Sequence, residues 1–183
     1  MLFIPGNIYH VYNRGNNREP VFYQTRNYHF FLSKAGKHIN KFADIISYCL
    51  MPNHFHFMIK VKEDIEGRSL NNEFAVLLRS YTRAINAQEG RTGSLFQQKT
   101  KAKNVGECCL VCFNYIHQNP LKAGIAKRFE DWEYSSFNEY IGKSRSQICN
   151  IQLGKEIIEF NTVEELYKLS YQNIDPQKRD ELY

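Results

Sequence analysis

Runs rich in apolar residues and bounded by turn residues predict β-strands at 8–14, 45–51 and 54–61. A fourth strand is predicted at 94–103, which follows a Gly-containing turn and would place Lys99, Lys101 and Lys103 on one side. Pro52 and Asn53 separate the second segment from the third, so these two strands are predicted to form a hairpin.

Other segments repeat apolar residues every three or four positions, which predicts amphipathic helices. The clearest covers 69–88, and its apolar stripe consists of Leu70, Phe74, Leu77, Leu78, Tyr81 and Ile85. The remaining predicted helices span 25–39, 105–119 and 162–169. Thr25 is the expected N-cap of the first, Thr162 and Glu165 form an expected capping box, and Pro120 is expected to end the helix that precedes it.

The resulting order of elements is β, α, β, β, α, β, α. This order predicts an α/β (α+β) fold, a ferredoxin-like split βαβ sandwich with an antiparallel central sheet and added helices. Helices are expected on one sheet face, which leaves the other face open for chemistry. The polar residues 143–152 are expected to be a linker, and residues 176–183 are expected to be mobile.

The chain has 183 residues and 43% hydrophobic content, which fits one compact domain with a small appendage. A formal charge of +5 permits a polyanionic partner. The five cysteines are an odd number without a paired framework, so free thiols in a reducing, cytoplasmic compartment are expected. The N-terminus does not resemble a signal peptide, and no apolar run predicts a membrane partner.

Two histidines lie one residue apart in the stretch MPNHFHFMIK, residues 51–60. In a strand, His54 and His56 share one face while Phe55 and Phe57 share the core face. Two imidazoles on a rigid strand can bind one metal ion. Strand histidines without further partners are more often structural residues, so this pattern alone is a weak indication.

Tyr115 and Asn119 lie one helical turn apart, on the flank of an apolar stripe, and are therefore expected where the helix meets the domain. Two imidazoles and a carboxamide oxygen can hold a divalent cation, which polarises a phosphate as a Lewis acid. A phenolate beside that phosphate can attack phosphorus. Taken alone, Tyr115 would be an ordinary core tyrosine.

Several stretches resemble the HUH single-strand endonucleases in the same order along the chain. PNHFHFMI resembles their histidine–hydrophobe–histidine motif, and NYIHQNPLKAGI resembles the tyrosine motif of their single-tyrosine transposases. YHVYNRGNNREPVF, GSLFQQKTKA and WEYSSFNEY also fit. The REP-associated tyrosine transposases are the most similar branch. The resemblance covers roughly residues 5–141, so 1–141 are predicted to be an HUH transposase-like catalytic domain and 142–183 a C-terminal extension of unknown role.

The resemblance implies a metal-dependent single-stranded DNA endonuclease and strand transferase that acts near DNA hairpins. It implies that His54 and His56 bind Mg²⁺ or Mn²⁺, that Asn119 is a third ligand, and that Tyr115 forms a 5′-phosphotyrosine intermediate. It also favours a monomer, with a dimer as the alternative. Single-stranded DNA and DNA hairpins are the expected partners, and the candidate contacts to them are Arg14, Arg18, Arg79, Arg83, Lys99, Lys101, Lys103 and Lys122.

Alternatives remain open at this point. A domesticated, non-catalytic binder of structured DNA or RNA and a hydrolytic nuclease without a covalent step both fit parts of the pattern. The lysine row at 99–103 is also typical of an edge strand that avoids aggregation, and Arg79 and Arg83 of a solvated helix face. The Cys109–Cys112 spacing could indicate redox or zinc chemistry, but core packing is the expected role. His10 and His117 have no spacing argument for a site.

Overall fold

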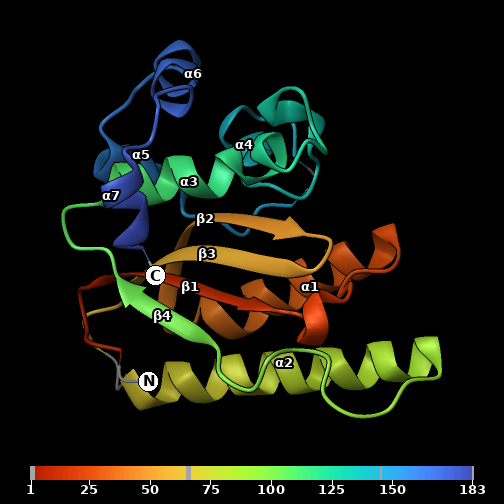
Figure 1. Cartoon of the computed structure of the whole chain (residues 1–183). Helices are drawn as coiled ribbons and strands as arrows, with labels where there is room; N and C mark the ends of the chain where they lie inside the picture. Colours follow the sequence, from red (N-terminus) through yellow and green to blue (C-terminus); the bar gives the residue numbers. More distant parts are fainter. Residues whose placement is uncertain (1–2, 65–66, 145, 183) are drawn as a thin grey trace.

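The computed structural model describes residues 3–64, 67–144 and 146–182. Figure 1 shows a central sheet between two helical layers. The strands are β1 (Ile8–Arg14), β2 (Ala43–Met51), β3 (His54–Val61) and β4 (Lys101–Asn104). The helices are α1 (Thr25–Ile39), α2 (Gly67–Glu89), α3 (Cys109–Lys122), α4 (Phe137–Tyr140), α5 (Ile151–Ile158), α6 (Val163–Ser170) and α7 (Pro176–Asp180), with the 3₁₀ turns η1 (Asn16–Arg18) and η2 (Phe129–Asp131).

The sheet has the order β2-β3-β1-β4, and every neighbouring pair is antiparallel. This order and the βαββαβ succession confirm the predicted ferredoxin-like sandwich. β3 pairs with β2 as the predicted hairpin and with β1 on its other side. In that second pairing His56 lies opposite Tyr12 and His54 opposite Arg14. The strand that carries the histidines is therefore central in the sheet.

Each face of the sheet packs on its own apolar core. Phe55 and Phe57 point into the core beneath the sheet, which α1 and α2 complete. Met58 points to the opposite face and joins Cys112 and Ile116 of α3 in a second core. The expectation that the histidine face stays open was wrong, because α3 and the elements after it cover much of that face (Figure 1). Because α3 is part of this covering layer, residues on α3 can lie next to the histidines of β3.

Two predicted boundaries near α3 were also wrong. Residues 105–108 precede the helix, since Gly106 has a φ of +48°, outside the helical region. At the other end, the helix continues through Pro120 to Lys122. Proline removes one donor, but burial of Pro120 and a bond from the Ala123 N–H to the Asn119 carbonyl maintain the last turn.

The predicted strand 94–103 is mostly a loop, and only Lys101–Asn104 pair as the edge strand β4. Leu95 and Phe96 are adjacent and both belong to the core beneath the sheet, which a regular strand with alternating sides does not allow. At α1, Gln24 rather than Thr25 is the N-cap. At α6, Thr162 and Glu165 form the predicted capping box.

The C-terminal segment forms three helices that pack on α3, of which only α6 was predicted. The predicted linker is attached to the domain, because the N–H groups of Ile148 and Cys149 donate to Glu139 and that of Asn150 donates to the Ile45 carbonyl. α5 begins at Ile151, within the last two residues of the predicted linker. The predicted mobile end is ordered as far as Leu182, which is fully buried; Tyr183 lies outside the described residues. None of the helices in the described ranges combines the length and apolar character that a membrane crossing requires.

Candidate functional site

His54, His56 and Tyr115 line a single small cavity of about 150 Å³. The ring centroids of His54 and His56 are 4.9 Å apart, and the Tyr115 ring lies 5.4 Å from His56 in an edge-to-face arrangement. β3 contributes the histidines from below and α3 contributes the tyrosine from above. The juxtaposition expected from the sequence is therefore present. The remaining cavity wall consists of Tyr12, Asn13, Arg14, Gln97, Lys99 and Lys101.

Hydrogen bonds hold both imidazoles by their Nδ1 atoms. His54 Nδ1 lies 2.7 Å from Asn53 Oδ1, and His56 Nδ1 lies 2.8 Å from His10 Nε2. Asn53 is itself held, since its Nδ2 donates to the Arg18 carbonyl. His56 is only 3% exposed, and its buried Nε2 has no hydrogen-bond partner among the described residues. This nitrogen is therefore available to a ligand.

Burial makes the site histidines poor bases. Desolvation by burial, with a smaller contribution from the nearby Arg14 charge, lowers the pKa of His54 to about 4, against a raising effect of a hydrogen bond to Asn119. Desolvation likewise lowers the pKa of His10 to about 4, against a raising effect of the Leu182 carbonyl. The pKa of His56 is well below its ordinary value, first through burial and then through His10, His54 and Arg14. Neutral imidazoles are the form that binds metals.

Buried neutral histidines also predict acid lability of the fold. His117 lies in the core, bonded to Ser136 Oγ at 2.7 Å, and burial lowers its pKa to about 3. Between pH 6.5 and that value the unfolded chain binds a proton that the folded chain does not, so stability must fall as pH falls. Each such histidine adds about 1.4 kcal/mol per pH unit to the slope of the free energy of unfolding against pH.

We expect the free energy of unfolding, measured by urea denaturation in chelator at pH 7 to 4.5, to fall steeply below pH 6.5. His117→Gln removes one of these groups and should reduce the slope by about 1.4 kcal/mol per unit. Parallel pH profiles for the two proteins would contradict the assignment of His117 as a buried neutral base.

Asn119 lies beside the cavity rather than in its wall. Its Nδ2 donates to the Tyr115 carbonyl at 2.9 Å, and its side chain is close enough to His54 to influence the pKa of that ring. In the described residues no three histidine, cysteine or acidic side chains gather around one point. A divalent ion would thus depend on His54, His56 and an oxygen ligand of another type, for which the Asn119 amide is one candidate. Two neutral imidazoles and an unpartnered Nε2 fit such an ion.

A much larger groove of about 1120 Å³ adjoins the cavity. It runs between α2 and the segment 93–103, and it shares Tyr12, Asn13, Gln97, Lys99 and Lys101 with the cavity wall. Five of the eight predicted DNA contacts line it, namely Arg79, Arg83, Lys99, Lys101 and Lys103. Positions spread over 25 residues of sequence thus form one basic surface that leads to Tyr115.

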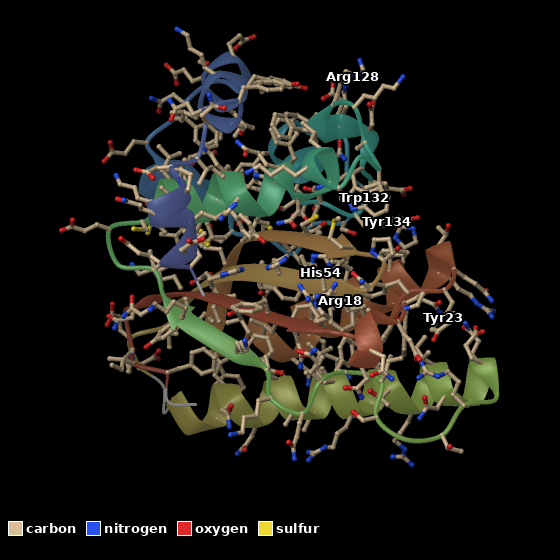
Figure 2. The ribbon with its side chains drawn as sticks, viewed as in Figure 1. Arg18, Tyr23, His54, Arg128, Trp132 and Tyr134 are labelled. Atoms are coloured by element: carbon tan, nitrogen blue, oxygen red, sulfur yellow. The ribbon has the colours of Figure 1, made fainter. Side chains whose placement is uncertain are left out.

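The other three basic candidates lie elsewhere. Arg14 lines the cavity itself. Arg18 is exposed in η1, at the end of the sheet where His54 lies, and its carbonyl accepts from Asn53 (Figure 2). Lys122 lines neither hollow and lies near Arg179 in the C-terminal layer, where burial and that neighbour lower its pKa.

The sequence interpretation missed His10 and Tyr12, the partners of His56 on β1. The ring centroid of His10 lies 5.0 Å from that of His56 and 4.7 Å from that of Tyr12. Alternation in IYHVYNR places His10, Tyr12 and Arg14 on one face. Alternation does not predict that β1 pairs with β3, and this pairing puts that face next to the histidines.

The chain is similar to known proteins in sequence and in fold. The family model described as IS200-like transposase matches residues 5–119. A relative from Haemophilus influenzae that carries the name of a REP-associated tyrosine transposase is 24% identical over 106 residues, 52% of this chain and 59% of its own length. The chain therefore spans about three-fifths of that curated relative.

Among solved structures, that of a REP-associated tyrosine transposase bound to a REP hairpin superposes with a TM-score of 0.65 and 18% identity. The similarity covers 81% of this chain and 87% of the other, and it shows a shared fold. Because the IS200-like model matches more than half of the sequence, including both histidines and Tyr115, this chain belongs to the IS200-like transposase family.

Proposed function

We propose that this chain is a metal-dependent endonuclease and strand transferase for single-stranded DNA, acting near DNA hairpins through a 5′-phosphotyrosine intermediate on Tyr115. One observation carries the proposal: His54, His56 and Tyr115 surround a cavity that adjoins a long basic groove. The hairpin in the structure of the similar transposase supports DNA hairpins as the partner class.

His54 and His56, together with Asn119, would hold the Mg²⁺ or Mn²⁺ ion. Such an ion supplies Lewis-acid polarisation of a phosphate oxygen when bound. The protein's part is to present two neutral imidazoles from a rigid central strand, so that little reorganisation accompanies binding.

Tyr115 supplies the nucleophile. Its phenol oxygen loses a proton and forms a bond to phosphorus, while the bond from phosphorus to the 3′ oxygen breaks and that oxygen leaves as a 3′-hydroxyl after taking up a proton. The DNA 5′-phosphate is then joined to the tyrosine, and attack by a 3′-hydroxyl reverses the reaction. Because the phosphodiester energy is retained in the phosphotyrosine bond, rejoining requires no nucleotide cofactor.

The basic groove would hold the single strand leading to the cavity. Arginine and lysine side chains on both walls suit phosphates, and the amide side chains of Asn71 and Gln97 offer hydrogen bonds to bases. We further propose that residues 1–141 supply the catalytic and DNA-binding side chains, that 142–183 form an extension packed on them, and that the protein acts as a monomer.

Removing one positive charge from the groove should measurably weaken the binding of single-stranded DNA. Arg83 is exposed and lines the groove but not the cavity. We expect Arg83→Gln to weaken binding of a single-stranded oligonucleotide several-fold and to reduce the slope of log affinity against log salt by about 0.7. Fluorescence anisotropy between 50 and 300 mM salt measures both quantities.

Lys168→Gln is the matched control, because Lys168 is an exposed cation on α6, in the layer on the other side of the sheet from α2. It should leave affinity and salt slope unchanged. Equal effects of the two substitutions would show that net charge, rather than the groove, attracts DNA.

The proposal is tested by incubating the protein and Mn²⁺ with hairpin oligonucleotides that carry single-stranded flanks, labelled in turn at either end. We expect a covalent adduct that contains the strand downstream of the cut, together with a free 3′-hydroxyl on the upstream strand. Cleavage without an adduct would indicate a hydrolytic nuclease, and tight binding without cleavage would indicate a non-catalytic binder.

A further inference from the structure

The last described residue of the chain reaches the candidate metal site through one histidine. His10 Nδ1 lies 3.1 Å from the Leu182 carbonyl oxygen, and His10 Nε2 lies 2.8 Å from His56 Nδ1. His10 and Leu182 are fully buried, and His56 is 3% exposed. Residues 172 positions apart in sequence therefore form a short hydrogen-bonded relay inside the protein.

The hydrogen positions in this relay follow from its chemistry. A backbone carbonyl only accepts hydrogen bonds, so His10 Nδ1 must carry the proton of its neutral ring. His10 Nε2 then has a lone pair and accepts from His56, which places the proton of His56 on Nδ1. The remaining nitrogen, His56 Nε2, is left with a lone pair, and it is the buried atom without a partner.

We propose that the Leu182 carbonyl, acting through His10, holds His56 in the Nδ1–H tautomer and so directs its Nε2 lone pair to the metal. His10 is thus a positioning residue, and the end of the C-terminal segment is part of the active-site architecture. The use of Nε2 for a metal rests on the proposed function, whereas the tautomer itself does not.

The carbonyl is held in place by packing. The Leu182 side chain belongs to the same apolar core as Cys112 and Phe113 of α3. The backbone N–H of Leu182 donates to the Arg179 carbonyl. Beside it, Cys108 Sγ lies 3.3 Å from Glu181 Oε2. α7 returns the chain to the sheet next to β1, as Figure 1 shows. Outer partners of this kind orient metal-bound histidines and increase their basicity.

The relay makes a specific difference because a histidine side chain in water favours the other tautomer, with the proton on Nε2. Without an acceptor at His10, the proton of His56 would return to Nε2 and block the ligand position. A purely structural His10, stacked between Tyr12 and His56, would affect stability but would not determine the tautomer.

The first test is the nitrogen NMR spectrum of the full, metal-free chain with labelled histidines, using His56→Ala to assign the His56 signals. We expect His56 in the wild type to be protonated on Nδ1 and unprotonated on Nε2. Protonation on Nε2 would overturn the proposal. This measurement needs neither metal, nor DNA, nor a variant of His10.

The second test compares His10→Leu, which offers no acceptor, with His10→Gln, whose amide oxygen can accept from His56. We expect the His56 proton to move to Nε2 in His10→Leu only, and its Mn²⁺ affinity, measured by the spin resonance of free Mn²⁺, to fall about 10- to 100-fold. Equal affinities for the two variants would contradict the relay. If His10→Leu fails to fold, the His56 tautomer in the spectra of the wild type and of His10→Gln still tests the proposal.

The role of the chain end is tested by deleting residues 182–183, with Leu182→Met as the control that keeps both the carbonyl and the apolar volume. Deletion should reproduce the tautomer shift of His10→Leu, and Leu182→Met should retain the wild-type spectrum. If the tautomer is as proposed but Mn²⁺ does not bind, the proposed function fails and the relay stands.

Discussion

Replacing Tyr115 by phenylalanine is expected to abolish DNA cleavage, by roughly a thousandfold or more, while hairpin binding changes little. The substitution removes one oxygen atom, and that atom is the proposed nucleophile. Tyr115 is only partly buried, and it lies against His56 at 5.4 Å between ring centroids, so the phenylalanine ring keeps the packing. Denaturing gels of labelled oligonucleotides measure both the cut strand and the adduct.

Tyr12→Phe is the matched control for this experiment. Tyr12 also lines the cavity, but burial, followed by the proximity of Tyr115, raises the pKa of its phenol, which makes phenolate formation harder. We expect this variant to retain the covalent adduct. Loss of the adduct in Tyr12→Phe, with retention in Tyr115→Phe, would identify Tyr12 as the nucleophile and refute the proposed role of Tyr115.

Removing His56 should have the second largest effect. We expect His56→Ala to lower Mn²⁺ affinity more than a hundredfold and to eliminate cleavage, because one of two imidazoles is lost from a site without a third histidine, cysteine or acidic ligand in the described part of the chain. Titration calorimetry with Mn²⁺ measures the first effect without reference to activity. Circular dichroism must accompany it, since the substitution also leaves a cavity in the core.

His29→Ala provides the comparison for this loss. His29 is exposed on α1, where it lies 3.7 Å from Glu133 and its ring centroid lies 5.8 Å from that of Tyr134. Its removal should leave Mn²⁺ binding and cleavage as in the wild type. Undiminished Mn²⁺ binding by a folded His56→Ala protein would mean that the ion is held elsewhere, and the site would have to be reassigned.

Much of the fold follows from local sequence patterns. Alternation separated His54 and His56 from Phe55 and Phe57, and the structure has these pairs on opposite faces of β3. The apolar stripe of the long helix is buried as predicted, apart from Leu78, which is partly buried. These successes have a common cause: the periodicity of side chains in strands and helices is a local property.

Features that depend on distant contacts were not predictable in the same way. Helix α3 tolerates Pro120 because its neighbours bury it, and Leu95 and Phe96 leave strand geometry because both find places in the core. The C-terminal end was expected to be mobile because chain termini usually are. Packing of α7 on α3 and the buried Leu182 anchor it instead, and no local pattern predicts a contact between residues 10 and 182.

For the site, the sequence pattern identified the side chains but not their supporting partners. The proximity of Tyr115 to the histidines was inferred from family resemblance together with helix geometry, and the structure brings the rings together. The groove was foreseen only as scattered basic residues, since its walls come from α2 and from a loop whose path the sequence pattern did not predict.

The most direct test of the account is to locate the covalent bond. The wild-type protein, incubated with Mn²⁺ and a hairpin oligonucleotide with a single-stranded flank, is digested with trypsin and nuclease, and the modified peptide is sequenced by mass spectrometry. The account predicts a nucleotide 5′-phosphate attached to the phenol oxygen of Tyr115. Attachment at any other residue, or complete cleavage with no modified peptide, would contradict it.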